Sequence, residues 1–148
     1  MPLSGVGNAS HVHISLNKSV GPVSVATEMR FWGGVLRHIE AVCAFCLPEE
    51  VSYKRVVENC WSGGTWVAWG EQNRETPLRR VKQGRWEVRC LDGFANMYLA
   101  IRAIVAAGVL GLEEDYGDIA PPCPSKSFNQ STTIELTILR ESEQNERI

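Results

Sequence analysis

The segment "GRWEVRCLDG" (residues 84–93) has the alternation of a short strand whose two faces differ in polarity. Successive side chains of a strand point to opposite sides, so Arg85, Glu87 and Arg89 share one face and Trp86 lies on the other, apolar face. A half-exposed sheet often carries a solvated charged face, which is the simplest interpretation of these ten residues alone. The alternative is that the charged face lines a binding site.

A second strand with the same pattern lies near the start of the chain. The segment "HVHISL" (residues 11–16) places His11, His13 and Ser15 on one face and aliphatic residues on the other. The glycine-bounded segment 63–70 and the segment 76–81 have the composition of two more short strands before the strand that contains Glu87. Strands this close in the sequence predict an antiparallel sheet.

Two helices are predicted to accompany the sheet. Residues 27–45 repeat apolar side chains at roughly helical spacing, and Pro48 ends the pattern. Residues 94–112 are apolar on nearly all sides, which raises the alternative of a membrane span. The central Arg102 is costly in lipid, so we expect a buried helix of a soluble domain and no membrane.

The expected fold class is α+β, with a curved antiparallel sheet and helices packed on its outer face. A chain of 148 residues is long enough for one domain with a real core. We expect that domain to occupy residues 1–124, because the composition beyond "APPCP" turns polar and charged. Residues 125–148 are expected to form a poorly ordered tail, with "TTIELTIL" as one possible edge strand.

The charge distribution favours a small anionic ligand over a polyanionic partner. The formal net charge of −2 argues against a nucleic-acid or anionic-membrane binder. Eleven of the 15 basic residues are arginine, and six of these lie between positions 55 and 89 with only four glutamates. Guanidinium groups bind carboxylates and phosphates in bidentate fashion. The surplus of arginine in this segment therefore indicates a carboxylate or phosphate ligand.

The cysteines indicate a reducing compartment. Their number is five, which is odd, and no charged-then-apolar leader opens the sequence, so we expect a cytoplasmic protein without a disulfide framework. Cys43 and Cys46 form a C-x-x-C pair within the first predicted helix, with no second pair elsewhere. Buried free thiols are the favoured interpretation, and redox or zinc chemistry is the alternative.

The two polar strand faces together carry the groups that phosphoryl transfer needs. An imidazole and a carboxylate on neighbouring strands are suitable ligands for a divalent metal, and arginines around that metal would hold phosphate. The sequence contains no G-x-x-x-x-G-K-[ST], so a nucleotide would not be held by a P-loop.

The order of these motifs makes a family resemblance recognisable. "HVHISL", a helix, "SYKRV", "NRETPLR", "RWEVRCLD" and "ANMYLAIRAIVAAGVLGL" follow one another in the sequence. Taken together, residues 5–124 resemble the C-terminal half of the glutamine synthetase catalytic domain, closest to the fungal glutamine synthetase-like branch. The resemblance implies an ATP-dependent carboxylate–amine ligase that activates a carboxylate as an acyl phosphate for attack by ammonia or an amine.

The resemblance also implies roles for individual residues. His11 and Glu87 correspond to ligands of one Mg²⁺ or Mn²⁺ ion. The remaining matches bind substrates: His13 and Ser15 toward the nucleotide, Arg79 and Arg85 around the ATP phosphates, Arg74 and Arg89 at the transferred phosphoryl group, and Arg55 and Gly7 at the amino acid. The implied partners are small molecules, namely ATP, an amino acid such as glutamate, and ammonia or an amine. Full-length members of the family are expected to form homo-oligomers.

Departures from the family pattern leave two function classes open. The family's other metal-binding carboxylates and its N-terminal domain lie upstream of the H-x-H strand, and "VVENCWSGG" (residues 56–64) stands where the family has a flap with a glutamate. Trp61 lies near that place, and Val6 stands where an asparagine is usual. The first class is a ligase present as a partial catalytic domain, inactive alone. The second is a non-catalytic relative with an interaction or regulatory role, or an incomplete gene model.

Overall fold

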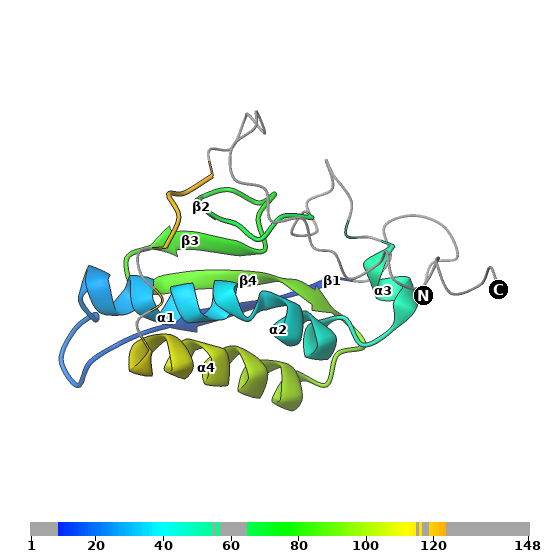
Figure 1. Ribbon diagram of the computed structural model, residues 1–148, viewed down its shortest axis with the longest axis horizontal. Helices are drawn as coiled ribbons and strands as arrows, with labels where there is room; N and C mark the ends of the chain where they lie inside the picture. Colours follow the sequence, from blue (N-terminus) through cyan, green and yellow to red (C-terminus); the bar gives the residue numbers. More distant parts are fainter. Residues whose placement is uncertain (1–8, 55, 57–64, 115, 117–118, 124–148) are drawn as a thin grey trace.

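The computed structural model of the chain describes residues 9–54, 56, 65–114, 116 and 119–123 (Figure 1). Its described elements comprise a four-stranded sheet and four helices. The strands are β1 (Ala9–Ser15), β2 (Trp69–Glu71), β3 (Leu78–Lys82) and β4 (Arg85–Asp92), and the helices are α1 (Val25–Arg37), α2 (Ile39–Cys46), α3 (Glu50–Tyr53) and α4 (Met97–Glu113). The α+β class is confirmed. Residues 125–148 lie outside the described part, so the tail stays a prediction.

The sheet has the order β1-β4-β3-β2 and is mixed, not wholly antiparallel as the sequence predicted. Strand β4 pairs antiparallel with both β1 and β3, whereas β2 pairs parallel with β3. The chain returns between β2 and β3 through a tight turn, in which the Asn73 side chain accepts a hydrogen bond from the Glu75 N–H (2.9 Å). The Thr76 hydroxyl also stabilises the turn, because it donates to the carbonyl oxygens of Asn73 (3.2 Å) and Leu78 (2.8 Å). This return brings the chain back to its starting end and makes the short pair parallel.

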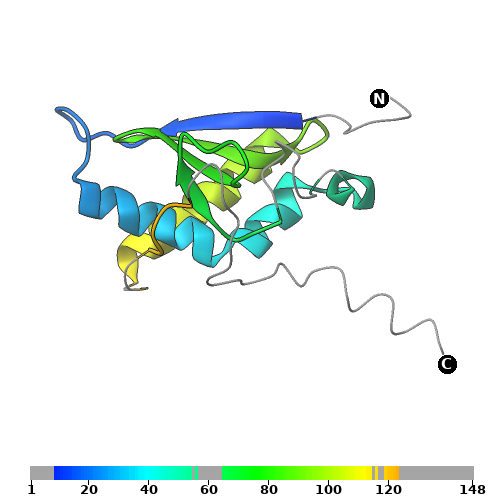
Figure 2. The ribbon, with the colours of Figure 1, turned by 90° about the horizontal axis from the view of Figure 1, so that it is seen from above.

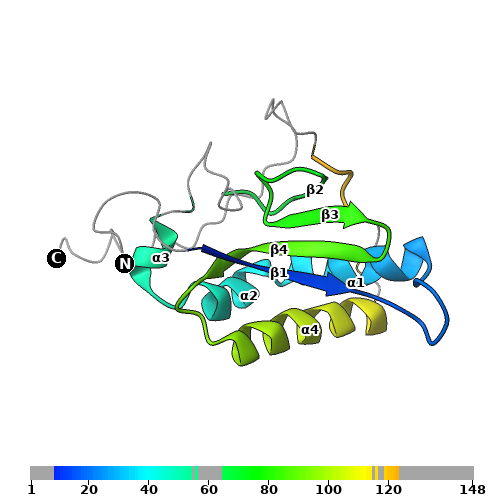
Figure 3. The ribbon, with the colours of Figure 1, turned by 180° about the vertical axis from the view of Figure 1, so that it is seen from behind.

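The three longer helices cover one face of the sheet. In Figure 1, α1 and α2 lie in front of the strands and α4 lies below them; in Figure 3, from behind, the strands lie in front of α1 and α2. The edge-on view in Figure 2 shows β1 on the side away from α1 and α2. The helices thus pack on one face, as predicted; because the core lies there, we call this helix-covered side the inner face from here on, and the opposite side the outer face.

One predicted helix is divided in two. The sequence pattern indicated a single helix over residues 27–45, but His38 leaves the helical conformation (φ −109°, ψ 21°) and separates α1 from α2. The His38 ring contacts the Tyr116 hydroxyl (Nε2···Oη 3.0 Å), a residue far along the chain. Hydrophobic periodicity continues through the break, so it could not be read from the pattern.

Helices α1 and α4 pack closely because glycines lie at their contact. A Cβ atom added to Gly34 would collide with the backbone of Ala107 and Gly111, and one added to Gly111 would collide with the Arg30 carbonyl oxygen and with Gly34. By contrast, a Cβ atom on the neighbouring Gly33 would meet nothing. The two backbones therefore approach to a distance that only glycine permits at positions 34 and 111.

Helix α4 is buried on one side only. Its small and aliphatic residues Ala100, Ile104 and Ala107 face the core, whereas Tyr98 is 88% exposed and several aliphatic residues on the same side are half-exposed. Within the described residues, no helix combines the length and apolarity needed to cross a membrane. Our prediction of a buried helix is therefore correct for one side of α4.

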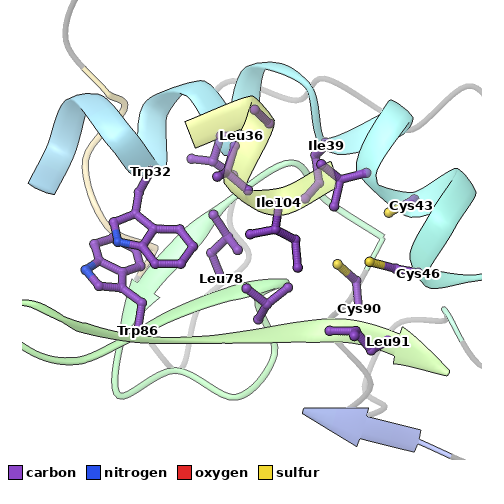
Figure 4. Packing of buried hydrophobic residues seen from close by; sticks show 14 of the residues in the cluster. Trp32, Leu36, Ile39, Cys43, Cys46, Leu78, Trp86, Cys90, Leu91 and Ile104 are labelled. Carbon is purple, nitrogen blue, oxygen red and sulfur yellow. The ribbon is translucent and has the colours of Figure 1, made fainter. Parts of the chain in front are cut away.

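The core lies between the helices and the inner face of the sheet (Figure 4). At one end, Trp86 of β4 stacks on Trp32 of α1 with ring centroids 5.0 Å apart. At the other end, Figure 4 shows Cys43 and Cys46 of α2 close to Cys90 of β4. Cys43 and Cys46 are buried free thiols, as predicted, and Cys90 is buried beside them. The contact with Cys90 and, after it, burial raise the pKa of Cys43 and of Cys46, so both thiols stay protonated and inert.

Candidate functional site

Strand alternation sends neighbouring residues of β3 and β4 to opposite faces, as the sequence predicted. Trp86 and Val88 lie in the core of the inner face, while Glu87 points outward between them. Arg79 is the cross-strand partner of Glu87 on β3, and His13 is its partner on β1. The strand pairing thus gathers an imidazole, a carboxylate and a guanidinium in one row across the outer face.

Glu87 is the centre of this row and is only 3% exposed. Its Oε2 accepts a hydrogen bond from Arg79 Nη1 (2.8 Å), and its Oε1 accepts one from Arg89 Nη1 (2.7 Å). His11 Nδ1 lies 3.1 Å from the same Oε1, whereas His13 Nε2 is 4.0 Å away. The carboxylate is therefore bound on both oxygens by arginine and has an imidazole nitrogen beside it.

A register shift between β1 and β4 lies beside His11, which approaches Glu87 more closely than His13 does. Ser10 pairs with Leu91 and Val12 with Val88, so the single residue His11 of β1 faces two residues of β4, Arg89 and Cys90. The extra residue is therefore on β4, and such a bulge bends the strand locally and shifts the register of the pair. The irregularity thus brings His11 to the carboxylate although His13 is its register partner.

The electrostatics keep Glu87 ionised at neutral pH. Burial by itself would raise the pKa of this carboxyl, but the Arg79 hydrogen bond and the charges of Arg89 and His11 outweigh burial and lower the pKa below its usual value. Burial lowers the pKa of Arg89, and the adjacent Glu87 partly compensates. An ionised carboxylate beside an imidazole is a suitable half-site for a divalent cation.

The other predicted site residues are placed as follows. Ser15 is exposed on β1 opposite Arg85, which is exposed at the start of β4. Arg74 is exposed in the turn before β3, and its carbonyl oxygen accepts a hydrogen bond from Arg89 Nε (3.1 Å). Gly7 and Arg55, the predicted amino-acid-binding residues, lie outside the described residues.

One residue at this site was not predicted from the sequence. Gln72 follows β2, and its side-chain oxygen accepts a hydrogen bond from Arg79 Nη2 (2.6 Å). No strand alternation covers position 72, so the only available signal was its place directly before the "NR" of the "NRETPLR" motif.

Comparison with known proteins supports the resemblance. The family described as "Glutamine synthetase, catalytic domain" matches residues 2–140. This match extends beyond Pro124, our predicted domain boundary. The structure describes no residue after Cys123, so the boundary stays a prediction.

Individual relatives agree with the family match. The chain is 46% identical to protein fluG of Emericella nidulans over 121 residues, covering 82% of this chain and 13% of fluG. It is 37% identical to glutamine synthetase of Pyrococcus woesei over 123 residues, covering 76% and 28%. A solved structure titled "GmaS/ADP complex-Conformation 1" superposes with a TM-score of 0.66 at 30% identity, covering 79% of this chain and 30% of that one.

The chain thus spans less than a third of the length of each of these relatives. Its fold, its ordered motifs and the family match across residues 2–140 nevertheless agree. The chain belongs to the glutamine synthetase catalytic-domain family.

Proposed function

We propose that the outer face of the sheet is part of the active site of an ATP-dependent carboxylate–amine ligase. The observation that carries this proposal is the buried Glu87 carboxylate, with arginine on both oxygens and His11 at 3.1 Å. A buried carboxylate used only for stability does not need an exposed imidazole beside it. The sequence resemblance assigns the same two residues to one metal ion.

His11 and Glu87 would hold one Mg²⁺ or Mn²⁺ ion, and their chemistry fits a hard to borderline divalent cation. Among the described residues, no group of three or more His, Cys, Asp or Glu side chains is placed to hold a metal. The two residues are therefore a partial ligand set, and further ligands must come from water, substrate or other protein groups. When bound, the cation would neutralise phosphate charge and polarise the transferred phosphoryl group.

The arginines would act on the phosphates of ATP and on the acyl phosphate. Arg74 and Arg89 are proposed to stabilise charge at the transferred phosphoryl group, and Arg79 and Arg85 to contact the remaining phosphates. His13 and Ser15 would lie toward the nucleotide. The relative solved as an ADP complex supports nucleotide binding by this fold.

The amino-acid substrate is proposed to be glutamate or a similar acid, with ammonia or an amine as the second substrate. Arg55 and Gly7 would hold its carboxylate end, by resemblance to the family. We further expect a cytoplasmic enzyme that is homo-oligomeric in full length. Because this chain covers less than a third of its relatives, we expect the 148 residues alone not to turn over ATP.

The metal site is tested by titrating the purified chain with Mn²⁺. Binding is measured as the loss of the free Mn²⁺ signal in electron paramagnetic resonance. Glu87→Gln removes the charge but keeps the size, and we expect binding at least about tenfold weaker. Glu71→Gln is the matched control, because Glu71 is an exposed glutamate of the same sheet. Equal binding by both variants would contradict the assignment of Glu87.

The catalytic expectation is tested separately by glutamate-dependent phosphate release. The chain alone should release no phosphate above background. Turnover that disappears in Glu87→Gln would show that the site is complete within these 148 residues.

A further inference from the structure

Gln72 has the only positive φ angle (55°) among the non-glycine residues that the structure describes. L-residues with side chains rarely adopt this left-handed conformation, and such residues concentrate at functional sites. Two hydrogen bonds hold Gln72 there: its N–H donates to the Arg80 carbonyl oxygen (3.1 Å), and its Nε2 donates to the Val81 carbonyl oxygen (2.5 Å). The residue is therefore anchored to β3 by both its backbone and its side chain.

The remaining polar atom of the Gln72 side chain points to Arg79. Its Oε1 accepts from Arg79 Nη2 (2.6 Å), while Arg79 Nη1 donates to Glu87 Oε2 (2.8 Å). Arg79 Nε is buried and has no hydrogen-bond partner in the described part of the chain. The guanidinium is consequently held between two acceptors, one on each terminal nitrogen, and it cannot turn without losing one of them.

The chain of contacts runs from a fixed residue at the edge of the site to its central carboxylate. Gln72 is anchored to β3, it fixes Arg79, and Arg79 fixes one oxygen of Glu87. The other oxygen is left to Arg89 and His11. A group that orients a metal-binding carboxylate has a large influence on metal affinity without touching the metal.

We infer that Gln72 is a positioning residue, which orients Glu87 by holding the Arg79 guanidinium. This inference deepens the proposed function and rests on it only for the metal. Its first part, the immobilisation of Arg79 by Gln72, stands or falls independently of any metal.

The main variant is Gln72→Gly, because glycine accepts the left-handed backbone and removes only the side chain. Gln72→Glu is the conservative variant, since it restores an oxygen acceptor for Arg79 Nη2. Gln83→Gly is the matched control: Gln83 is an exposed glutamine in the turn between β3 and β4. Melting temperatures of all variants establish that each one is folded.

The first measurement is the rate of rotation of the Arg79 guanidinium about its Nε–Cζ bond. This rate is measured by NMR on the chain labelled with ¹⁵N-arginine. The Arg79 signal is assigned by its absence in Arg79→Lys. We expect rotation at least about tenfold faster in Gln72→Gly, slow again in Gln72→Glu and unchanged in Gln83→Gly, because only the first loses an acceptor. Unchanged rotation in Gln72→Gly would overturn the inference.

The second measurement is Mn²⁺ affinity, for which we expect Gln72→Gly to bind about tenfold more weakly than the parent chain. If Arg79 rotates faster and Glu87→Gln weakens binding while Gln72→Gly does not, Gln72 does not orient Glu87 and the inference is wrong. If neither Gln72→Gly nor Glu87→Gln changes Mn²⁺ binding, the proposed metal site fails. In that case faster rotation still supports the role of Gln72 in holding Arg79.

Discussion

Two buried glutamates on opposite faces of the sheet show how similar contacts can produce a structural and a functional site. Glu28 of α1 lies against the inner face and is 0% exposed, and Glu87 lies on the outer face at 3%. Each is bound by arginine from β3: Arg80 donates to Glu28 from Nε (2.9 Å) and Nη2 (3.1 Å), and Arg79 donates to Glu87. Because Arg79 and Arg80 are consecutive, strand alternation sends one to each face.

The two carboxylates differ in what else surrounds them. Trp86 Nε1 donates to Glu28 (2.5 Å), and Trp86 and Glu28 are both 0% exposed. Glu87 instead has two exposed histidines of β1 beside it. A carboxylate enclosed by donors on every side can only stabilise, whereas one with an open side and an imidazole can accept a ligand. The comparison predicts that mutations of Glu28 change stability and mutations of Glu87 change binding.

The largest expected effect is that of Glu28→Gln. Removing the buried charge of this pair leaves Arg80 with only the exposed Glu71 as a counter-ion, so we expect a loss of about 3 kcal/mol in the free energy of unfolding. Glu71→Gln is the control, because Glu71 pairs with the same Arg80 Nη1 (3.1 Å) but has a side chain that is 60% exposed. Its loss should be below about 0.5 kcal/mol. Urea unfolding measures the free energy of both variants. Similar losses would show that the buried Glu28–Arg80 pair stabilises the fold no more than the exposed Glu71–Arg80 pair does.

The second effect tests whether the position of α1, which carries Glu28, depends on its close packing against α4. Gly34→Ala places a methyl group against the backbone of α4, and we expect it to cost about 1–3 kcal/mol. Gly33→Ala meets nothing and should stabilise the helix by about 0.5–1 kcal/mol. Thermal unfolding of the pair measures the difference. Mn²⁺ binding on the outer face should be unchanged in Gly33→Ala, and a destabilised Gly33→Ala would contradict the close-packing explanation.

The third effect is the loss of stability at acid pH that we expect from the Glu28–Arg80 pair on the inner face. Burial alone would raise the pKa of Glu28, but hydrogen bonds from Arg80 and Trp86 lower it below its usual value of 4.5. A lowered folded-state pKa means that the pair contributes stability above about pH 4.5, and that this contribution is lost as the pH falls toward the folded-state value. The stability of Glu28→Gln should therefore fall less between pH 6 and pH 3 than that of the parent chain, as measured by urea unfolding. Parallel pH profiles would contradict this origin of the acid sensitivity.

The sequence predicted the faces of the strands better than the contacts between them. Alternation in residues 85–89 and 11–15 correctly separated the polar from the core-facing side chains, because it depends only on local strand geometry. The approach of His11 to Glu87 depends on the irregular register between Ser10 and Val12, which no local pattern encodes.

Contacts between segments that are distant in the sequence could likewise not be predicted from the sequence. The Glu28–Arg80 pair joins residues 52 positions apart, and the break at His38 coincides with a contact to Tyr116. The parallel pairing of β2 depends on a side-chain turn at Asn73 rather than on any strand pattern. Family resemblance supplied the candidate roles of His11 and Glu87, but the hold of Gln72 on Arg79 became visible only in the structure.

The smallest expected effect on stability separates the two histidines of the outer face. His11 lies 3.1 Å from Glu87 Oε1 and His13 lies 4.0 Å away, and both side chains are more than a third exposed. Exposed contacts of this kind contribute little, so His11→Ala and His13→Ala should each change the free energy of unfolding by less than about 0.5 kcal/mol. Metal binding should nevertheless distinguish them, because only His11 is placed to share a cation with Glu87. We expect Mn²⁺ binding about tenfold weaker in His11→Ala and nearly unchanged in His13→Ala, measured by titration of the folded variants. A stronger effect of His13→Ala would move the proposed ligand from His11, which lies opposite the bulge of β4, to His13, the register partner of Glu87.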